Sequence, residues 1–245
     1  MAAKKEVTII QMNDTHGYLE EHWEHFFDGD HSEYIRAGGY PRIASYLKKV
    51  RYEKDGHVLF LDGGVTFHGT YPVVQTKGKI LPSFLNQLGL DGMTAHWEFA
   101  YGPEAFKDLV KSLKYPMLAI NCYYKETEKR VFKPYSIKEV HGLKIGIIGI
   151  AATIIDKVMP KHFSEGIYFT MGDKELPGFI HTLREEEQVD LVIVLSHLGF
   201  PQEIKLAEEV ELRPFVKTVS IGSLRCTPPS CIFLRCQRQR VLRSE

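Results

Sequence analysis

The sequence has no excess of charge of either sign. Its 31 lysine and arginine residues balance its 31 aspartate and glutamate residues. A chain without net charge is not drawn as a whole to nucleic acid polymers or to an anionic membrane surface. We therefore expect no nucleic acid polymer as partner. A small nucleotide is not excluded, because such a ligand depends on local charge.

The sequence also lacks long hydrophobic runs. No window holds the roughly 18 consecutive apolar residues that a membrane-spanning helix needs, so we expect no membrane partner. The apolar stretch of residues 7–12 is too short for the hydrophobic region of a signal peptide, and no small-residue cleavage site follows it. A cytoplasmic location is the expectation, although an exported protein stripped of its signal would have the same sequence.

Cysteines are few. There are four, and three of them (Cys226, Cys231 and Cys236) lie in the last twenty residues. Their four-residue gaps do not match the tight pairs that are typical of structural zinc sites. The sequence predicts neither a zinc site nor a disulfide framework at these cysteines.

What the chain does have is an alternation of short apolar runs with amphipathic stretches. The apolar runs predict buried strands at residues 7–10, 58–61, 92–94, 117–120, 144–150 and 191–195. Apolar residues at helical spacing predict helices at residues 40–50, 80–88, 103–113, 176–187 and 204–210. Strands and helices in alternation indicate an α/β layered fold.

Two segments interrupt this alternation. Residues 20–33 are rich in acids, aromatics and histidines (His22, His25 and His31), and we expect a long solvated loop whose histidines bind nothing. From residue 212 to 245 the chain is basic, contains cysteine and has no clear period. We expect residues 1–211 to form the domain and residues 212–245 to be an atypical tail. A change of reading frame would explain that tail.

Polar residues follow four of the predicted strands. Asp14 and His16 follow the first strand, Asp62 ends the second, His96 follows the third and His197 follows the strand of residues 191–195. Open α/β sheets assemble their sites at the carboxyl ends of strands. We therefore predict that Asp14, His16, His96 and His197 converge and bind a divalent ion. Aspartate with several histidines suits Mn²⁺, Fe²⁺ or Zn²⁺ better than Ca²⁺.

These residues occur in four motifs that together resemble the calcineurin-like metallophosphoesterases. The motifs are Asn13-Asp14-Thr15-His16-Gly17, the segment from Leu61 to Thr70, His96-Trp97-Glu98-Phe99 and Leu195-Ser196-His197-Leu198-Gly199. Within the family the sequence is most similar to the 5′-nucleotidase and 2′,3′-cyclic-nucleotide phosphodiesterase group, over residues 5 to 211. The resemblance implies a four-layer αββα sandwich that binds two divalent cations and hydrolyses phosphate esters, with a nucleotide as substrate.

The resemblance also assigns roles to individual residues. It implies that Asp14 and His16 hold one metal ion and that His197 helps to hold the other. His96 takes the place of a metal-binding asparagine, and it is the candidate catalytic residue. Trp97 takes the place of a histidine that acts on the leaving group, and an indole cannot act as a general acid.

The sequence departs from the family pattern in two further ways. Val65 stands where the family has an aspartate that bridges both metal ions. The family's Gly-His-Thr-His motif, which supplies one histidine to each metal, is absent after Val210, and so is the larger carboxyl-terminal domain that holds the nucleoside. The αββα domain is therefore predicted to be incomplete at its carboxyl end, with impaired activity.

Two alternatives to a nucleotide phosphoesterase stay open. The His-Trp-Glu-Phe order, followed by Tyr101-Gly102, is similar to the dimanganese thiosulfohydrolase branch of the family. The chain could instead be a non-catalytic module that keeps the fold and binds a nucleotide or a metal ion.

Overall fold

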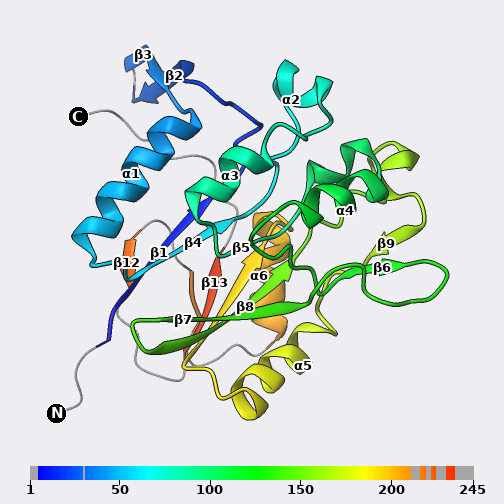
Figure 1. Cartoon of the computed structure of the whole chain (residues 1–245). Coiled ribbons are helices and arrows are strands. Elements are labelled where there is room, and N and C mark those ends of the chain that lie inside the picture. The colour runs from blue at the N-terminus through cyan, green and yellow to red at the C-terminus, as the bar shows by residue number, and fades with distance from the viewer. Residues whose placement is uncertain (1–4, 30, 211–215, 219–221, 225–229, 235–245) are drawn as a thin grey trace.

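The computed structural model describes residues 5–29, 31–210, 216–218, 222–224 and 230–234. Two β-sheets lie face to face, and helices cover their outer faces (Figure 1). No helix in the described part of the chain has the length and apolar character that a membrane crossing requires.

The first sheet has the strand order β12-β1-β4-β5. Its strands are β1 (Val7–Met12), β4 (Val58–Asp62), β5 (Gly92–Met93) and β12 (Gly222–Leu224). β1, β4 and β5 are parallel, whereas β12 is antiparallel to β1. Parallel strands carry the loops after β1, β4 and β5 to the same edge of the sheet.

The second sheet has the strand order β11-β13-β10-β8-β7. Its strands are β7 (Tyr135–Val140), β8 (Leu143–Ile150), β10 (Leu191–Ser196), β11 (Val216–Thr218) and β13 (Ser230–Leu234). β8, β10 and β13 are parallel, and β7 forms an antiparallel hairpin with β8. β8 and β10 are almost entirely buried, as expected for strands that are covered on both faces.

Three hydrophobic clusters define four layers. The cluster between the sheets joins Val7 and Leu59 to Ile145 and Ile193. A second cluster packs the outer face of the first sheet against α1 (Tyr40–Glu53), α3 (Pro82–Leu88) and α4 (Pro103–Lys111). The third packs the second sheet against α5 (Leu176–His181), the π-helical turn η3 (Thr182–Glu186) and α6 (Phe200–Glu209). This order confirms the predicted αββα sandwich.

The expectation of a loop at residues 20–33 was wrong. The segment forms the antiparallel hairpin of β2 (His22–Asp28) and β3 (His31–Ala37), which stands apart from both sheets (Figure 1). Exposed and half-buried residues alternate along the hairpin, and exposed Trp23, Phe27 and Tyr34 lie on one face of it. The many charged residues of the segment favoured a loop and obscured this alternation.

Residues 117–120 do not form the predicted strand. Met117 and Leu118 make only isolated bridges, to Met93 and to Lys133. Further on, β6 (Cys122–Tyr124) pairs with β9 (Ile167–Phe169) in a small separate sheet. Two turns of 3-10 helix, η1 (Trp97–Tyr101) and η2 (Lys161–Ser164), and the short helix α2 (Tyr71–Gln75) complete the elements.

The sequence pattern predicted that strands stop after residue 211, and the structure differs from this expectation. β11, β12 and β13 lie in this part of the chain, and β12 and β13 pair with β1 and β10. The run of Ile232, Phe233 and Leu234 consists of residues that favour strands. The rest of residues 212–245 lies outside the described part. The domain boundary at residue 211 stays a prediction.

Candidate metal centre

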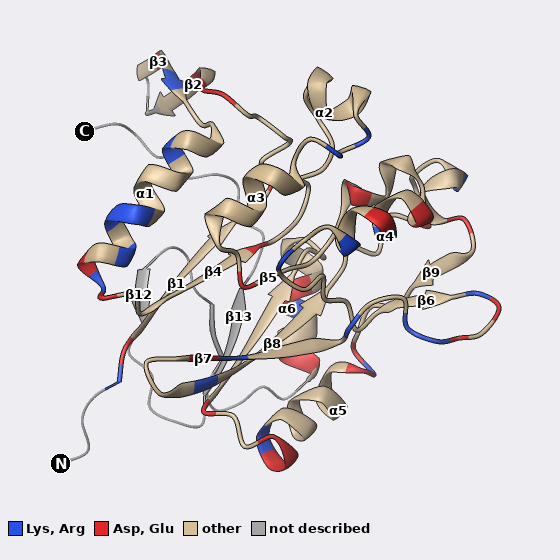
Figure 2. Ribbon diagram, in the orientation of Figure 1, with Lys and Arg blue, Asp and Glu red and all other residues tan. Residues whose placement is uncertain are grey.

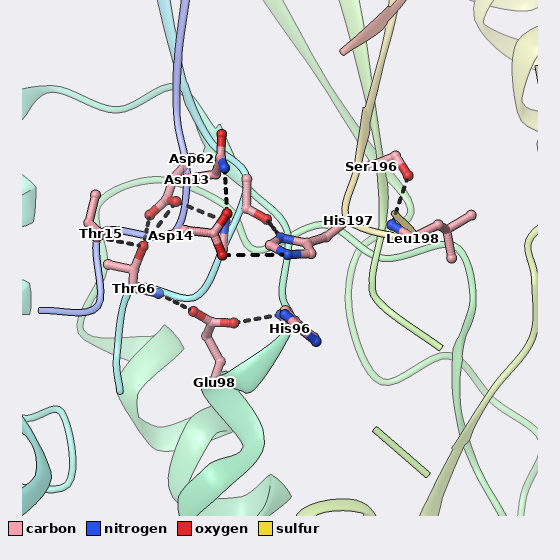
Figure 3. Close-up of polar contacts among 12 residues, drawn as sticks. Asn13, Asp14, Thr15, Asp62, Thr66, His96, Glu98, Ser196, His197 and Leu198 are labelled. Atoms are coloured by element: carbon pink, nitrogen blue, oxygen red, sulfur yellow. Dashed lines mark hydrogen bonds and ion pairs between the residues drawn. The ribbon is translucent and has the colours of Figure 1, made fainter. Parts of the chain in front are cut away.

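Loops from both sheets meet at one point beyond the carboxyl ends of their strands (Figure 3). Asp14 follows β1, His96 follows β5 and His197 follows β10. Ligand atoms of these three side chains all lie within 4.8 Å of one another. Among the described residues, they are the one group of three or more histidine, cysteine or acidic side chains that are so arranged.

His197 is oriented by the loop that follows β4. Its Nδ1 lies 2.5 Å from the carbonyl oxygen of Gly63, and the side chain is buried. A carbonyl accepts only, so Nδ1 carries the proton and Nε2 keeps its lone pair. Nε2 lies 3.9 Å from Oδ1 of Asp14 (Figure 3). A histidine whose second nitrogen donates to a carbonyl is the usual arrangement of a metal ligand in proteins.

His96 has no hydrogen-bond partner for its ring within the described part of the chain. Both ring nitrogens are buried, and its ring centroid lies 4.4 Å from that of His197. Burial, followed by the neighbouring His197, lowers the pKa of His96 to about 3. The ring is therefore neutral at physiological pH, and a buried neutral imidazole without a partner is costly unless it is satisfied. A metal ion would satisfy it.

The backbone around Asp14 is unusual. Asp14, His16 and Val65 all have left-handed conformations, with φ values of 53°, 47° and 56°. The two loops are tied together because the Asp14 N–H donates to the Gly64 carbonyl and the His16 N–H donates to the Val65 carbonyl, both at 2.8 Å. Aspartate tolerates this conformation, whereas a β-branched valine is a genuine outlier there.

Glu98 is a residue of the site that the sequence analysis quoted in a motif without giving it a role. It is fully buried, and its two oxygens accept hydrogen bonds from the backbone N–H groups of Thr66 and His96, both at 2.6 Å (Figure 3). Hydrogen bonds to a carboxylate are among the stronger ones in proteins. Glu98 therefore fixes the loop after β4 against the loop that carries His96.

Asp62 is the second such residue. It is fully buried and accepts hydrogen bonds from the Gly64 N–H at 2.9 Å and from the Thr66 hydroxyl at 2.8 Å. Burial raises the pKa of Asp62 to about 7. The signal that could have indicated a role for both acids was their place near strand ends, and the hydrogen bonds show that each holds a loop.

His16 is half-buried and lies outside the close group of Asp14, His96 and His197. It is nevertheless nearby, because it contributes to the lowered pKa of His96 and, after burial, to the lowered pKa of His68. Val65 is buried and offers no lone pair to an ion. The residues present thus fit one divalent ion at Asp14, His96 and His197, and provide no carboxylate to bridge a second.

Comparison with known proteins shows what the whole chain is similar to. No family model matches the chain. Protein UshA of Yersinia enterocolitica is 30% identical over 198 residues, which are 79% of this chain and 34% of that protein. The 5′-nucleotidase of Bos taurus is 30% identical over 218 residues, which are 84% of this chain and 36% of that protein. The chain is thus similar to UshA and to 5′-nucleotidases over most of its own length. It spans about a third of the length of these relatives.

Solved structures of two further proteins share the fold. The sulfate thiohydrolase SoxB of Thermus thermophilus superimposes with a TM-score of 0.76 at 19% identity, covering 89% of this chain and 48% of that one. The NAD nucleotidase of Haemophilus influenzae gives 0.72 at 24% identity, covering 96% and 38%. The predicted resemblance to 5′-nucleotidases and the predicted αββα fold are confirmed.

Proposed function

We propose that this 5′-nucleotidase-like domain binds divalent metal ions through Asp14, His16, His96 and His197 and acts on phosphate esters of nucleotides. The observation that carries the proposal is the convergence of Asp14, His96 and His197. Both ring nitrogens of His96 are buried and have no partner among the residues that the structure describes. Their chemistry suits Mn²⁺, Zn²⁺ or Fe²⁺. The nucleotide is proposed because the relatives include proteins named 5′-nucleotidase.

The chain's own residues contribute binding and orientation. Asp14 brings negative charge, His96 brings a neutral imidazole, and His197 is held in place by the Gly63 carbonyl. When bound, a divalent cation polarises the phosphoryl oxygens and lowers the pKa of an attacking water. Trp97 follows His96 and lies beside it, with ring centroids 6.2 Å apart. Trp97 can shape the substrate site but cannot donate a proton to a leaving group in the way a histidine can.

We further propose that Val65 limits activity in this sequence. A carboxylate at this position would bring a second anion to a site that otherwise has Asp14 as its close acidic group. Without it, two cations repel each other with less shared counter-charge, so the second ion should be held weakly. The chain should therefore bind one metal ion better than two.

The test compares Val65→Asp with Val65→Asn, because the two variants have nearly the same shape and differ in charge. Hydrolysis of adenosine 5′-monophosphate is measured in excess Mn²⁺, together with the metal content by mass spectrometry. We expect activity and metal content to rise together in Val65→Asp and not in Val65→Asn. Equal behaviour of the two variants would show that the metal assignment is misplaced.

The thiosulfohydrolase alternative rests on the order His96-Trp97-Glu98-Phe99, which places an indole beside the metal centre. The same variants should be assayed on a thiosulfate ester, in which a sulfonate group is bound to sulfur. Turnover of this substrate without turnover of the nucleotide would favour this alternative. Calorimetry would detect a non-catalytic module, because the nucleotide would then bind without being hydrolysed. The cytoplasmic location stays a prediction.

A further inference from the structure

One cavity of the molecule includes no residue of the metal centre in its lining. It has a volume of about 570 Å³ and opens between residues 113–116 and strand β7. Met117 runs beside Met93 of β5 in the parallel sense, so residues 113–116 lie at the amino end of these strands. The metal centre follows their carboxyl ends. The lining of the cavity includes none of the proposed metal ligands Asp14, His16, His96 and His197.

The cavity is lined by cations that have no counter-charge. Lys114 and Lys133 both contribute to its wall, and neither has an ion-pair partner among the described residues. Lys138 of strand β7 is by contrast paired with Asp91 at 2.8 Å. The side chains of Lys114 and Lys133 are exposed, so both ammonium groups are accessible to a ligand at the cavity mouth. The positive charge favours an anion.

The interior of the cavity adds a polar group and an apolar surface. The hydroxyl oxygen of Ser136 is buried and has no hydrogen-bond partner in the described part of the chain. A buried hydroxyl without a partner is unfavourable, so a ligand that reaches it and bonds to it gains free energy. Tyr115, Pro116 and Ile137 supply aromatic and apolar wall around this hydroxyl.

We propose that this cavity binds a small organic anion, whose acidic group lies between Lys114 and Lys133 and whose apolar or aromatic body packs over Ser136. The cavity volume is within the range of about 300 to 1,000 Å³ that is usual for small-molecule sites. A phosphate monoester and a carboxylate both have the required chemistry. The ligand is not the substrate of the metal centre, because the cavity contains no metal-ligating group.

The test uses 8-anilinonaphthalene-1-sulfonate, an aromatic anion whose fluorescence rises on binding, with the whole purified chain. We expect saturable binding by the wild type. Lys114→Gln and Lys133→Gln should each raise Kd by roughly two- to fivefold, as expected for exposed charge pairs. Ser136→Val should weaken binding without a loss of charge, because it removes the hydroxyl and fills the space. Lys125→Gln, an exposed lysine outside the cavity, is the matched control.

A competition experiment identifies which acidic group the cavity prefers in its ligand. Phenyl phosphate and benzoate are each added to the bound probe, and the one that displaces it at lower concentration has the preferred acid. Binding should also weaken at 0.5 M salt, because exposed charges are screened. The proposal is overturned if the wild type does not bind the probe, or if the cavity variants bind it as tightly as Lys125→Gln.

Discussion

Asp62 and His96 should give the folding stability of this domain opposite dependences on pH. Burial is the main cause of both pKa shifts, and it disfavours the charged form of each group. For the acid Asp62 the charged form appears at high pH, whereas for the base His96 it appears at low pH. The same physical cause therefore acts in opposite directions along the pH axis.

For Asp62, the folded-state pKa of about 7 lies above the ordinary value of 3.8. Between these values the folded protein holds a proton that the unfolded chain has lost. Stability therefore decreases as the pH rises from about 4 to 7. Each unit of difference between the two pKa values corresponds to about 1.4 kcal/mol of stability, so the full decrease in stability is about 4 kcal/mol.

For His96, the folded-state pKa of about 3 lies below the ordinary value of 6.5. Between these values the unfolded chain holds a proton that the folded protein lacks. The stability from the neutral ring is complete above pH 6.5 and decreases as the pH falls toward 3. The magnitude is again about 4 to 5 kcal/mol. From pH 4 to 6.5 the two contributions nearly cancel in the wild type.

Urea denaturation at several pH values, with a chelator present to remove metal ions, measures this balance. Asp62→Asn should keep both hydrogen bonds, because the amide oxygen accepts from the Gly64 N–H and the amide N–H₂ donates to the Thr66 hydroxyl. Its free energy of unfolding should rise by about 1.4 kcal/mol per pH unit between pH 4 and 6.5, relative to the wild type. His96→Asn should give the opposite slope.

Asp55→Asn and His31→Asn are the controls, because both side chains are exposed. Each should follow the wild-type pH profile. If Asp62→Asn has the wild-type slope as well, the Asp62 carboxyl is not shielded from solvent as the structure indicates, and the reasoning fails.

Three further predictions concern the loops that hold the centre. Gly69→Ala should destabilise the fold by about 3 kcal/mol in urea denaturation, because a Cβ there would lie 2.2 Å from the His16 carbonyl oxygen. Glu98→Gln should cost about 2 kcal/mol and weaken Mn²⁺ binding in calorimetry, since an amide N–H₂ cannot accept a backbone hydrogen bond. Without metal, Val65→Asp should melt below Val65→Asn, because it adds a buried charge near Asp62. Mn²⁺ at about 100 times its Kd should raise the stability of Val65→Asp by about 2.7 kcal/mol.

The sequence predicted the layered fold because its main strands are apolar and continuous. Residues 58–61, 144–150 and 191–195 are strands in the structure, and their burial on both faces explains the signal. The convergence of Asp14, His96 and His197 followed from the same fact, since parallel strands bring their carboxyl ends together. His16 was predicted by the same argument, but its side chain lies outside the close group.

Other features depend on contacts that a linear pattern does not contain. The hairpin of β2 and β3 has polar residues on both faces, so no buried stripe identified it. The role of Glu98 depends on two backbone N–H groups, one of which is 32 residues away at Thr66. The sequence places Glu98 two residues after His96, and only the folded loops show which groups it bonds.

The backbone at Val65 indicates that the site's geometry does not depend on the residue at that position. A valine with φ of 56° costs roughly 1 to 3 kcal/mol, and it persists only where the surroundings fix the chain. Here Asp62 binds the N–H of Gly64, Glu98 binds that of Thr66, and the Val65 carbonyl accepts from the His16 N–H. These bonds hold the left-handed turn from both sides. A carboxylate placed at residue 65 would therefore find the backbone already in a conformation that aspartate tolerates better than valine does.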